Sequence, residues 1–224
     1  VFLDRWLGKV FDALDDLNLW DETLVILTTD HGTWNGDHGR MGKLGTHQYD
    51  GCSHIPLIAC HPTEGHGERR QQLVQLVDLY PTVLEGVGRP LPPSNDAKPL
   101  HGVSLLPLFS DADSPTRDCA LMGMFGKSVS ITDGDWTLHQ SPVATNQPLY
   151  WHGYHLARFI DYDLGPFSEG CRRVKNCRSW DQPTTLNNRK DDPSESTDVS
   201  HMEPKQLLRM QALLRDELVR FCAP

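Results

Sequence analysis

The stretch LVILTTDHGTWNGDHGRMGK, residues 24–43, decides the fold class. It opens with an unbroken β-prone run, which is typical of a strand buried on both faces of a parallel sheet. The run ends at Asp30-His31-Gly32, and a glycine-rich polar stretch follows. In open parallel sheets, ligands bind at the carboxyl ends of the strands. The end of this run is therefore the first place to expect a functional site.

The segments around this stretch predict further helices and strands. Apolar residues from Leu3 to Leu17 follow the spacing of one helix face, with a stop near Asn18. A second apolar run, residues 55–59, predicts another strand, and residues 73–77 suit a strand or the start of a helix. Asp78 resembles an N-cap before a helix that stops near residues 86–88. This alternation predicts an α/β sandwich.

The pattern changes after about residue 118. Two short alternating runs, 129–131 and 136–138, flank Asp133-Gly134 and predict a β-hairpin. After a long, mostly polar stretch, the spacing of apolar residues predicts a last amphipathic helix over 204–221. We therefore expect two domains: residues 1–118 as an α/β core, and residues 119–224 as a small antiparallel sheet with a C-terminal helix.

Composition argues against nucleic-acid binding, a membrane-spanning helix and a zinc ribbon. The net charge is −9, with 21 Lys and Arg against 30 Asp and Glu, so a nucleic-acid footprint is not expected. No apolar run approaches the roughly 18 residues of a membrane-spanning helix. The six cysteines form no CxxC pair, so a zinc ribbon is not expected either. Cys171 and Cys177 are either a disulfide across a short polar loop or free thiols.

Asp30 and His31 are a natural pair of ligands for a divalent metal. The carboxylate supplies charge, the neutral imidazole supplies a softer nitrogen, and the neighbouring glycines let the backbone approach an ion or oxyanion. Lys43 follows 13 residues after Asp30 and is suited to neutralising charge on a metal-bound anion. The competing interpretation is a simple strand-to-loop turn with a capping aspartate; the full string with Lys43 favours the metal site.

Several strings occur in an order that resembles a known family. They are Asp30-His31-Gly32, Asp37-His38-Gly39 with Gly42-Lys43, Ile55-Pro56-Leu57-Ile58, residues 78–84, residues 101–108, and Leu186 with Asp192-Pro193-Ser194-Glu195. Together they resemble the sulfatases and phosphonate monoester hydrolases of the alkaline phosphatase superfamily. The resemblance implies the C-terminal part of an alkaline-phosphatase-like α/β/α sandwich, followed by the small antiparallel subdomain.

The resemblance also implies roles for individual residues. Asp30 and His31 would bind a divalent metal, and Lys43 would contact the sulfate or phosphate group as a catalytic residue. Calcium is the first choice by family, and manganese is the alternative because imidazole suits softer ions. His38 joins Lys43 as a catalytic candidate that orients it or the metal ligands, against a solvent-facing loop histidine.

The family's nucleophile is missing from the sequence. Sulfatases use a formylglycine made from Cys or Ser in a Cys/Ser-x-Pro/Ala-x-Arg motif, and none of the six cysteines fits it. Cys60 comes nearest, but Glu64 stands in place of the arginine. Because the chain opens abruptly at Val1, we expect a fragment whose partner is the N-terminal half of the same fold. Alone, it should be inactive and poorly soluble.

The sequence thus predicts part of a hydrolase of small sulfate esters. A phosphonate or phosphodiester hydrolase on the same fold is the first alternative, and a non-catalytic truncated chain is the second. His47 and His54 are weaker cleft candidates, against ordinary exposed loop histidines. Lys127 could reach substrate from the smaller domain. Trp151, His152, Tyr154 and His155 suit either a substrate entrance or ordinary loop packing.

Overall fold

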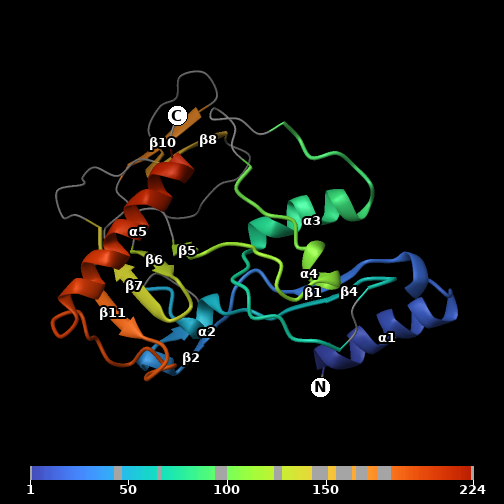
Figure 1. The fold of residues 1–224 in the computed structure, drawn as a ribbon, viewed down its shortest axis with the longest axis horizontal. Helices are drawn as coiled ribbons and strands as arrows, with labels where there is room; N and C mark the ends of the chain where they lie inside the picture. The colour runs from blue at the N-terminus through green and yellow to red at the C-terminus, as the bar shows by residue number, and fades with distance from the viewer. Residues whose placement is uncertain are drawn as a thin grey trace. The chain divides into compact units, whose positions relative to one another are not determined.

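The computed structural model describes residues 2–42, 47–64, 67–93, 100–123, 128–142 and 183–222, together with the backbone of three strands within 151–175. This part of the chain divides into two compact units (Figure 1). The first holds residues 1–30 and 55–118, and the second holds 31–54 and 119–223. The division after residue 118 into a core domain and a small domain stays a prediction.

The first unit contains helices, short 3-10 turns and one pair of strands. Its elements are α1 (Phe2–Asp16), η1 (Trp20–Glu22), β1 (Val25–Thr28), β4 (Leu57–Cys60), η3 (Leu76–Asp78), α3 (Leu79–Gly86) and α4 (Pro107–Ser110). The predicted first helix is confirmed. It ends where Asn18 takes a positive φ of 54°, a conformation that asparagine tolerates at helix ends.

The strand predicted before Asp30 is confirmed as β1, but its partner differs from the expectation. β1 pairs with β4 antiparallel, with Val25 opposite Cys60 and Thr28 opposite Leu57. All four side chains of β1 are half-buried rather than fully buried. The predicted parallel pairing of β1 is therefore wrong for β4, the neighbouring strand that the structure describes. A continuous apolar run reports burial on two faces and carries no information on strand direction.

A buried carboxylate joins α3 to the segment after it. Asp78 has no exposed surface, accepts hydrogen bonds from the amides of Gln75 (2.7 Å) and Val103 (2.8 Å), and pairs with Arg117. The side chain of Asp78 therefore closes a capping box on η3. It makes no capping hydrogen bond to α3, so the predicted N-cap is wrong. The predicted stop near residues 86–88 is confirmed, because α3 ends at Gly86.

The second unit is built on antiparallel strands. Its elements are β2 (Trp34–Asn35), η2 (Asp37–Gly39), β3 (Met41–Gly42), α2 (Asp50–Ser53), β5 (Ala120–Gly123), β6 (Val129–Thr132), β7 (Trp136–Gln140), β8 (Trp151–Tyr154), β9 (Asp163–Leu164), β10 (Cys171–Lys175), β11 (Thr185–Asn188) and α5 (Pro204–Cys222). The main sheet has the order β11-β7-β6-β5, and a second sheet has the order β8-β10-β9.

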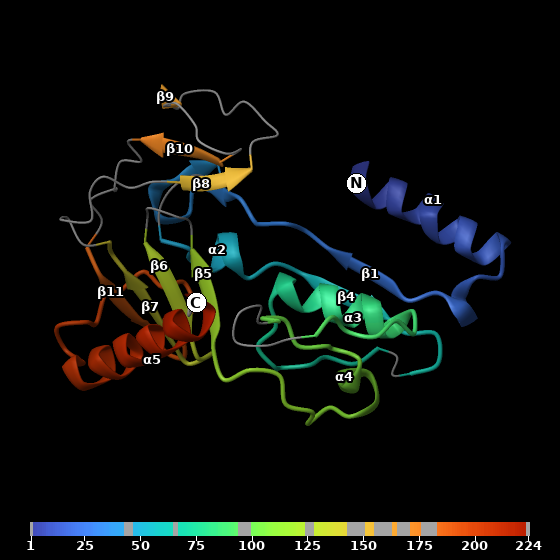
Figure 2. The same ribbon diagram turned by 90° about the horizontal axis from the view of Figure 1, so that it is seen from above.

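The predicted hairpin and last helix are confirmed. β6 and β7 pair antiparallel, and Gly134 makes the turn between them with a φ of +95°. α5 packs along one face of the four-stranded sheet (Figures 1 and 2). The core between them consists of Cys119, Ile131, Leu138, Leu186, Met210 and Leu214. No helix in the described residues is long and apolar enough to cross a membrane.

Candidate metal and anion site

Asp30 and His31 leave the carboxyl end of β1, as the sequence predicts. The carboxylate of Asp30 is exposed, and the hydroxyl of Thr29 donates to its Oδ1 at 3.3 Å. His31 is half-buried, with Nδ1 2.9 Å from the carbonyl oxygen of Gly32. A carbonyl only accepts hydrogen bonds, so Nδ1 carries the ring proton and the lone pair sits on Nε2. This is the tautomer that a metal-binding histidine needs.

Gly32, the last residue of the Asp30-His31-Gly32 motif, is hydrogen-bonded to α2. Its amide donates to the carbonyl oxygen of Cys52 at 2.9 Å. A Cβ atom at Gly32 would lie 2.0 Å from the carbonyl oxygen of Gly51, which no side chain can tolerate. The glycine is thus required for the close approach of two backbones, and this contact fixes the backbone position next to His31.

The donor set fits a hard or borderline divalent cation, but it is incomplete. One carboxylate and one imidazole supply two ligands, whereas such ions take four or more. Within the described ranges, no three His, Cys, Asp or Glu side chains come together in a way that could hold a metal. Further ligands would therefore come from outside these residues.

Lys43, Lys127 and His155 lie outside the described residues; for Trp151, His152 and Tyr154, only the backbone is described. The segment before Lys43 is a tight two-stranded turn, in which Trp34 pairs with Gly42 and Asn35 with Met41. Gly36 and Gly42 both have positive φ, which glycine adopts without strain. Whether Cys171 and Cys177 form a disulfide or are free thiols stays a prediction, because Cys177 lies outside the described residues.

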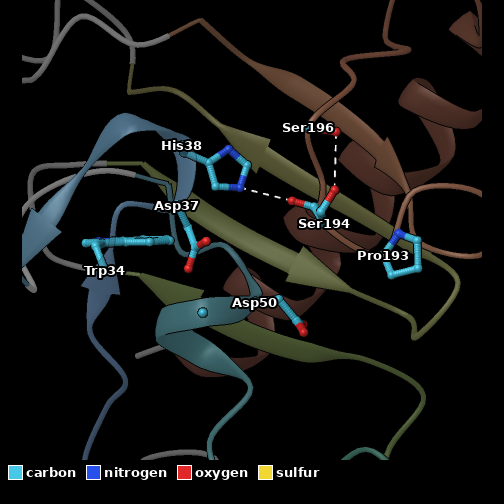
Figure 3. A pocket seen from close by; sticks show the side chains of 8 residues that line it. Trp34, Asp37, His38, Asp50, Pro193, Ser194 and Ser196 are labelled. Atoms are coloured by element: carbon cyan, nitrogen blue, oxygen red, sulfur yellow. Dashed lines mark hydrogen bonds between the residues drawn. The ribbon is translucent and has the colours of Figure 1, made fainter.

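His38 does not simply face solvent. Its ring stacks on Tyr49, with centroids 3.8 Å apart and planes within 5°. Its Nε2 donates to the carbonyl oxygen of Ser194 at 3.0 Å, a hydrogen bond drawn in Figure 3. These contacts tie the Asp-His-Gly turn of residues 37–39 to the loop that follows β11. A catalytic role for His38 stays a prediction.

The two weaker histidine candidates differ from one another. His47 is 2% exposed, and its Nε2 donates to the carbonyl oxygen of Pro183 at 2.9 Å. The expectation of an exposed loop residue is therefore wrong for His47. It holds for His54, whose exposed ring lies 3.0 Å from the carboxylate of Asp50. The i, i+4 spacing on α2 brings these two together.

Sequence reasoning missed His139, which is buried at the centre of this region. It lies on β7 with no exposed surface, and its Nδ1 shares a hydrogen bond of 2.7 Å with the hydroxyl of Ser130. Burial lowers the pKa of His139 well below its ordinary value, and His47, His38 and Arg189 lower it further. The signal available in the sequence was weak: a histidine paired with a serine across the predicted hairpin.

An ion network lies beside α2. Arg189 pairs with Asp50, whose backbone amide donates to Glu195 Oε2 at 3.0 Å. Glu195 is 3% exposed and adopts a positive φ of 55°, and the side-chain amide of Asn187 donates to its carbonyl oxygen at 3.0 Å. Burial raises the pKa of Glu195, while the charge of Arg189 acts in the opposite direction. The predicted Asp-Pro-Ser-Glu string therefore anchors α2.

A cavity of about 520 Å³ opens between these segments. Figure 3 shows side chains from residues 34–50 on one side and from 193–196 on the other. The lining residues are Trp34, Asp37, His38, Asp50, Gly51, Pro193, Ser194 and Ser196. Gly51 both lines the cavity and touches Gly32, so the cavity borders the motif that carries His31.

Comparison with known families agrees with the motif at the end of β1. Residues 1–88 match the family model described as Sulfatase. This match makes the first 88 residues similar to sulfatases. The matched segment contains Asp30, His31, His38 and Lys43. The described helices and antiparallel sheet have a fold similar to part of solved structures that include a phosphonate monoester hydrolase and a putative sulfatase.

Similar curated proteins include arylsulfatase K and the alkaline phosphatase superfamily protein PehA. The chain is 28% identical to arylsulfatase K of Xenopus laevis over 215 residues, covering 95% of this chain and 34% of that protein. It is 38% identical to human arylsulfatase K over 108 residues, covering 48% of this chain and 19% of that protein. The multifunctional alkaline phosphatase superfamily protein PehA of Trinickia caryophylli is 37% identical over 112 residues, covering 49% of this chain and 20% of that protein.

The solved structures with a similar fold are longer as well. BT4656, solved with its substrate D-glucosamine-2-N,6-O-disulfate, matches with a TM-score of 0.68 and 21% identity over 97% of this chain and 38% of that chain. The phosphonate monoester hydrolase of Agrobacterium radiobacter matches with a TM-score of 0.66 and 22% identity over 95% of this chain and 38% of that chain. The chain thus spans about a third of the Xenopus relative and 38% of each of these two solved chains.

Proposed function

We propose that the chain supplies part of the metal and anion site of a sulfuric ester hydrolase. The observation that carries this proposal is the Asp30-His31-Gly32 motif at the carboxyl end of β1, within the segment that matches the sulfatase family. The tautomer of His31 and the close backbone contact at Gly32 support a motif prepared for an ion. The arylsulfatase relatives support sulfate esters as the substrate class.

In this proposal, Asp30 and His31 hold the metal, and Lys43 binds the oxygens of the sulfuryl group. The metal, Ca²⁺ first and Mn²⁺ as the alternative, supplies positive charge that activates the nucleophile and stabilises the developing negative charge. Lys43 adds a second cation on the anion, which lowers the barrier to transfer. His38 holds the turn before Lys43 through Ser194 and Tyr49.

The nucleophile belongs to another part of the fold. A formylglycine requires a motif that none of the six cysteines provides. Cys60, the nearest match, sits at the end of β4 in the first unit. The proposed enzyme therefore combines these residues with a further segment that carries the nucleophile and the remaining metal ligands, in the same polypeptide or in a partner.

A second candidate, hydrolysis of phosphonate monoesters or phosphodiesters, has its own support. The phosphonate monoester hydrolase of Agrobacterium radiobacter has a similar fold, and PehA is among the relatives. Both chemistries need a metal and a cation around a tetrahedral centre, so the described residues suit either.

The test is to add an N-terminal segment with the formylglycine motif and to compare hydrolysis of an aryl sulfate with that of an aryl phosphonate. We expect a preference for sulfate, and a loss of kcat/KM of at least about a hundredfold for Asp30→Ala and for Lys43→Ala. His201→Gln, an exposed change in the second unit, serves as the matched control and should keep full activity.

Three outcomes separate the candidates. A preference for the phosphonate keeps the roles of the two site residues and changes the substrate class. Full activity of Asp30→Ala would rule out its role as a metal ligand. If neither substrate is hydrolysed with any divalent metal, the chain is a non-catalytic member of the fold.

A further inference from the structure

The loop that follows β11 carries an arginine, Arg189, and a buried glutamate, Glu195, that both contact α2. Glu195 is 3% exposed, and its backbone has a positive φ of 55°, a conformation that costs free energy in a residue other than glycine. Two hydrogen bonds hold it there. The amide of Glu195 donates to the carbonyl oxygen of Asp192, and the side-chain amide of Asn187 donates to the carbonyl oxygen of Glu195, both at 3.0 Å. The fold thus maintains an unfavourable backbone conformation that places this carboxylate in the interior.

Both side chains act on Asp50, the first residue of α2, which is labelled in Figure 3. Glu195 Oε2 accepts a hydrogen bond from the backbone amide of Asp50 at 3.0 Å, and Arg189 pairs with the Asp50 carboxylate. Nη1 of Arg189 also lies 3.9 Å from Oε1 of Glu195, so the three residues form one network. His54 faces Asp50 too, but its ring is exposed and solvent weakens that contact. We call Arg189 and Glu195 the α2 anchor.

α2 in turn holds Gly32. The carbonyl oxygen of Cys52 accepts a hydrogen bond from the amide of Gly32 at 2.9 Å, and the Cys52 thiol donates to the carbonyl oxygen of Gly32 at 3.7 Å. The backbone contact between Gly32 and Gly51 leaves no space for a Cβ atom. A shift of α2 would therefore move Gly32 or break these contacts.

The same carbonyl oxygen of Gly32 orients His31. It accepts a hydrogen bond from Nδ1 of the imidazole at 2.9 Å, which leaves the lone pair on Nε2. A histidine that binds a metal is commonly held by such a partner on its other ring nitrogen, and loss of the partner weakens metal binding. The orientation of the imidazole thus depends on Gly32, and through Gly32 on α2.

We propose that Arg189 and Glu195 are positioning residues, which orient His31 toward a divalent metal by holding α2 against Gly32. The metal in this inference rests on the proposed function; the link from the α2 anchor to Gly32 does not. An anchor that only stabilised the fold would leave the affinity of His31 for a metal unchanged. The test therefore follows both the link and the metal.

Hydrogen exchange on the full chain, fused to a soluble carrier protein, tests the link. The reporter is the amide of Gly32, and the amides of α5 in the same unit are the internal reference. We expect Arg189→Ala and Glu195→Ala each to lower the protection of Gly32 at least about tenfold while α5 stays protected, because each removes a charged partner from the network. The link is overturned if Gly32 keeps its wild-type protection in both variants. It is also overturned if α5 loses protection together with Gly32 in every variant of the two residues.

Matched variants isolate the α2 anchor. Arg215→Ala and Glu203→Ala remove exposed side chains of the same two types from the same unit, so both should exchange as the wild type does. Glu195→Gln keeps an oxygen that accepts from the Asp50 amide, so it should lose less protection at Gly32 than Glu195→Ala. Equal losses in these two variants would contradict the role of that hydrogen bond.

Binding of Mn²⁺ to the completed protein, with the added N-terminal segment, tests the effect on His31. Mn²⁺ in solution gives a paramagnetic resonance signal that differs from that of the bound ion, so a titration with the metal alone yields Kd without turnover. We expect Kd to rise about 10–100-fold in Arg189→Ala and in Glu195→Ala, as it does when other partners of metal-binding histidines are removed. Arg215→Ala and Glu203→Ala should keep the wild-type Kd.

A double variant shows whether the α2 anchor acts through His31. In His31→Ala the ligand is already absent, so adding Glu195→Ala should weaken Mn²⁺ binding by no more than about twofold further. A second full loss of about tenfold would mean that Glu195 affects the metal by another route, and it would overturn the proposal.

The failures are distinguishable. If the wild type binds Mn²⁺ and hydrolyses the ester, but Kd is the same in all variants of the α2 anchor, the inference fails and the proposed function stands. If the wild type binds no Mn²⁺, the proposed function fails, while the exchange of Gly32 still decides the link to α2.

Discussion

At the scale of single residues, two glycines mark places where two backbones meet. A Cβ atom at Gly32 would lie 2.0 Å from the carbonyl oxygen of Gly51, and one at Gly102 would lie 2.1 Å from that of Val77. Contacts under 3 Å force the backbone to move, because a carbonyl group cannot swing aside as a flexible side chain does. Each glycine therefore fixes the path of the chain beside a functional or structural motif.

Gly32→Ala tests this reading directly. We expect a loss of about 1–3 kcal/mol in the free energy of unfolding, because the added methyl group pushes apart the backbones at Gly32 and Gly51. Gly8→Ala is the matched control. It lies within α1 with open space around the added atom, so it should stabilise by about 0.5–1 kcal/mol. Urea unfolding of both variants gives the comparison, and a neutral Gly32→Ala contradicts the contact.

The buried pair of Asp78 and Arg117 gives a second prediction. Asp78 has no exposed surface and accepts two backbone hydrogen bonds besides the ion pair. Asp78→Ala leaves Arg117 with a side chain only 9% exposed and without its partner. We expect Asp78→Ala to lower the free energy of unfolding by about 3–5 kcal/mol. Breaking a buried ion pair leaves an unpaired buried charge, which costs far more than the intact pair contributes to stability.

An exposed ion pair provides the contrast. Lys190 pairs with Asp135 at 2.7 Å, with side chains 68% and 52% exposed. Removing it by Lys190→Ala should leave the melting temperature unchanged, because solvent screens such pairs. Equal losses of thermal stability in Asp78→Ala and Lys190→Ala would contradict the role of burial.

At the scale of elements, α5 depends on one face. Met210 and Leu214 on this helix have 0% and 4% of their surface exposed, and both lie against the core of the antiparallel sheet. The opposite face of the helix carries charged residues such as Arg215 and Asp216, which pair with each other at the surface. Burial of the apolar face, more than helix propensity, therefore holds α5 in place.

Met210→Ala should destabilise the second unit by about 2–5 kcal/mol through the cavity it leaves. Leu208→Ala, two residues earlier, removes a side chain that is 67% exposed and should change stability by less than about 0.5 kcal/mol. Circular dichroism during urea unfolding measures both. A large effect of Leu208→Ala would mean that this face is covered by another part of the protein.

At the scale of the whole molecule, apolar surface is left uncovered in the first unit. On a helical wheel at 100° per residue, the apolar residues of α1 fill about half the circumference. One edge of this arc is half-buried, while Phe2, Trp6 and Val10 are 79%, 50% and 56% exposed. Ile58 on β4 is 61% exposed as well. Among its described residues, the first unit pairs two strands, a marginal number for an independent sheet.

We therefore expect the chain produced by itself to aggregate or to be poorly soluble. Apolar patches of this kind favour association, because removing apolar surface from water lowers the free energy of the system. Size-exclusion chromatography with light scattering should find large species. The triple variant Phe2→Glu, Trp6→Glu and Val10→Glu should reduce them. A monodisperse wild-type monomer with one cooperative melting transition would contradict this prediction.

Much of the fold follows from periodicity in the sequence. Spacing of three and four residues located α1 and α5, and alternation around Asp133-Gly134 located the hairpin. The motif at the end of β1 also follows, because a strand end and its polar residues are adjacent in sequence. These features depend on local geometry, which a few neighbouring residues fully specify.

Only the tertiary structure decided the rest. The antiparallel pairing of β1 with β4, the hydrogen bond from Val103 to Asp78 and the burial of His47 depend on partners 25 to 136 residues away. The ring contact between Tyr49 and His139 is the extreme case, since these two residues show no shared pattern in the sequence. The sequence by itself thus determined the two main helices, the hairpin and the position of Asp30-His31 at the end of β1. Which histidines are buried together was decided by packing, because burial is a property of distant segments that meet.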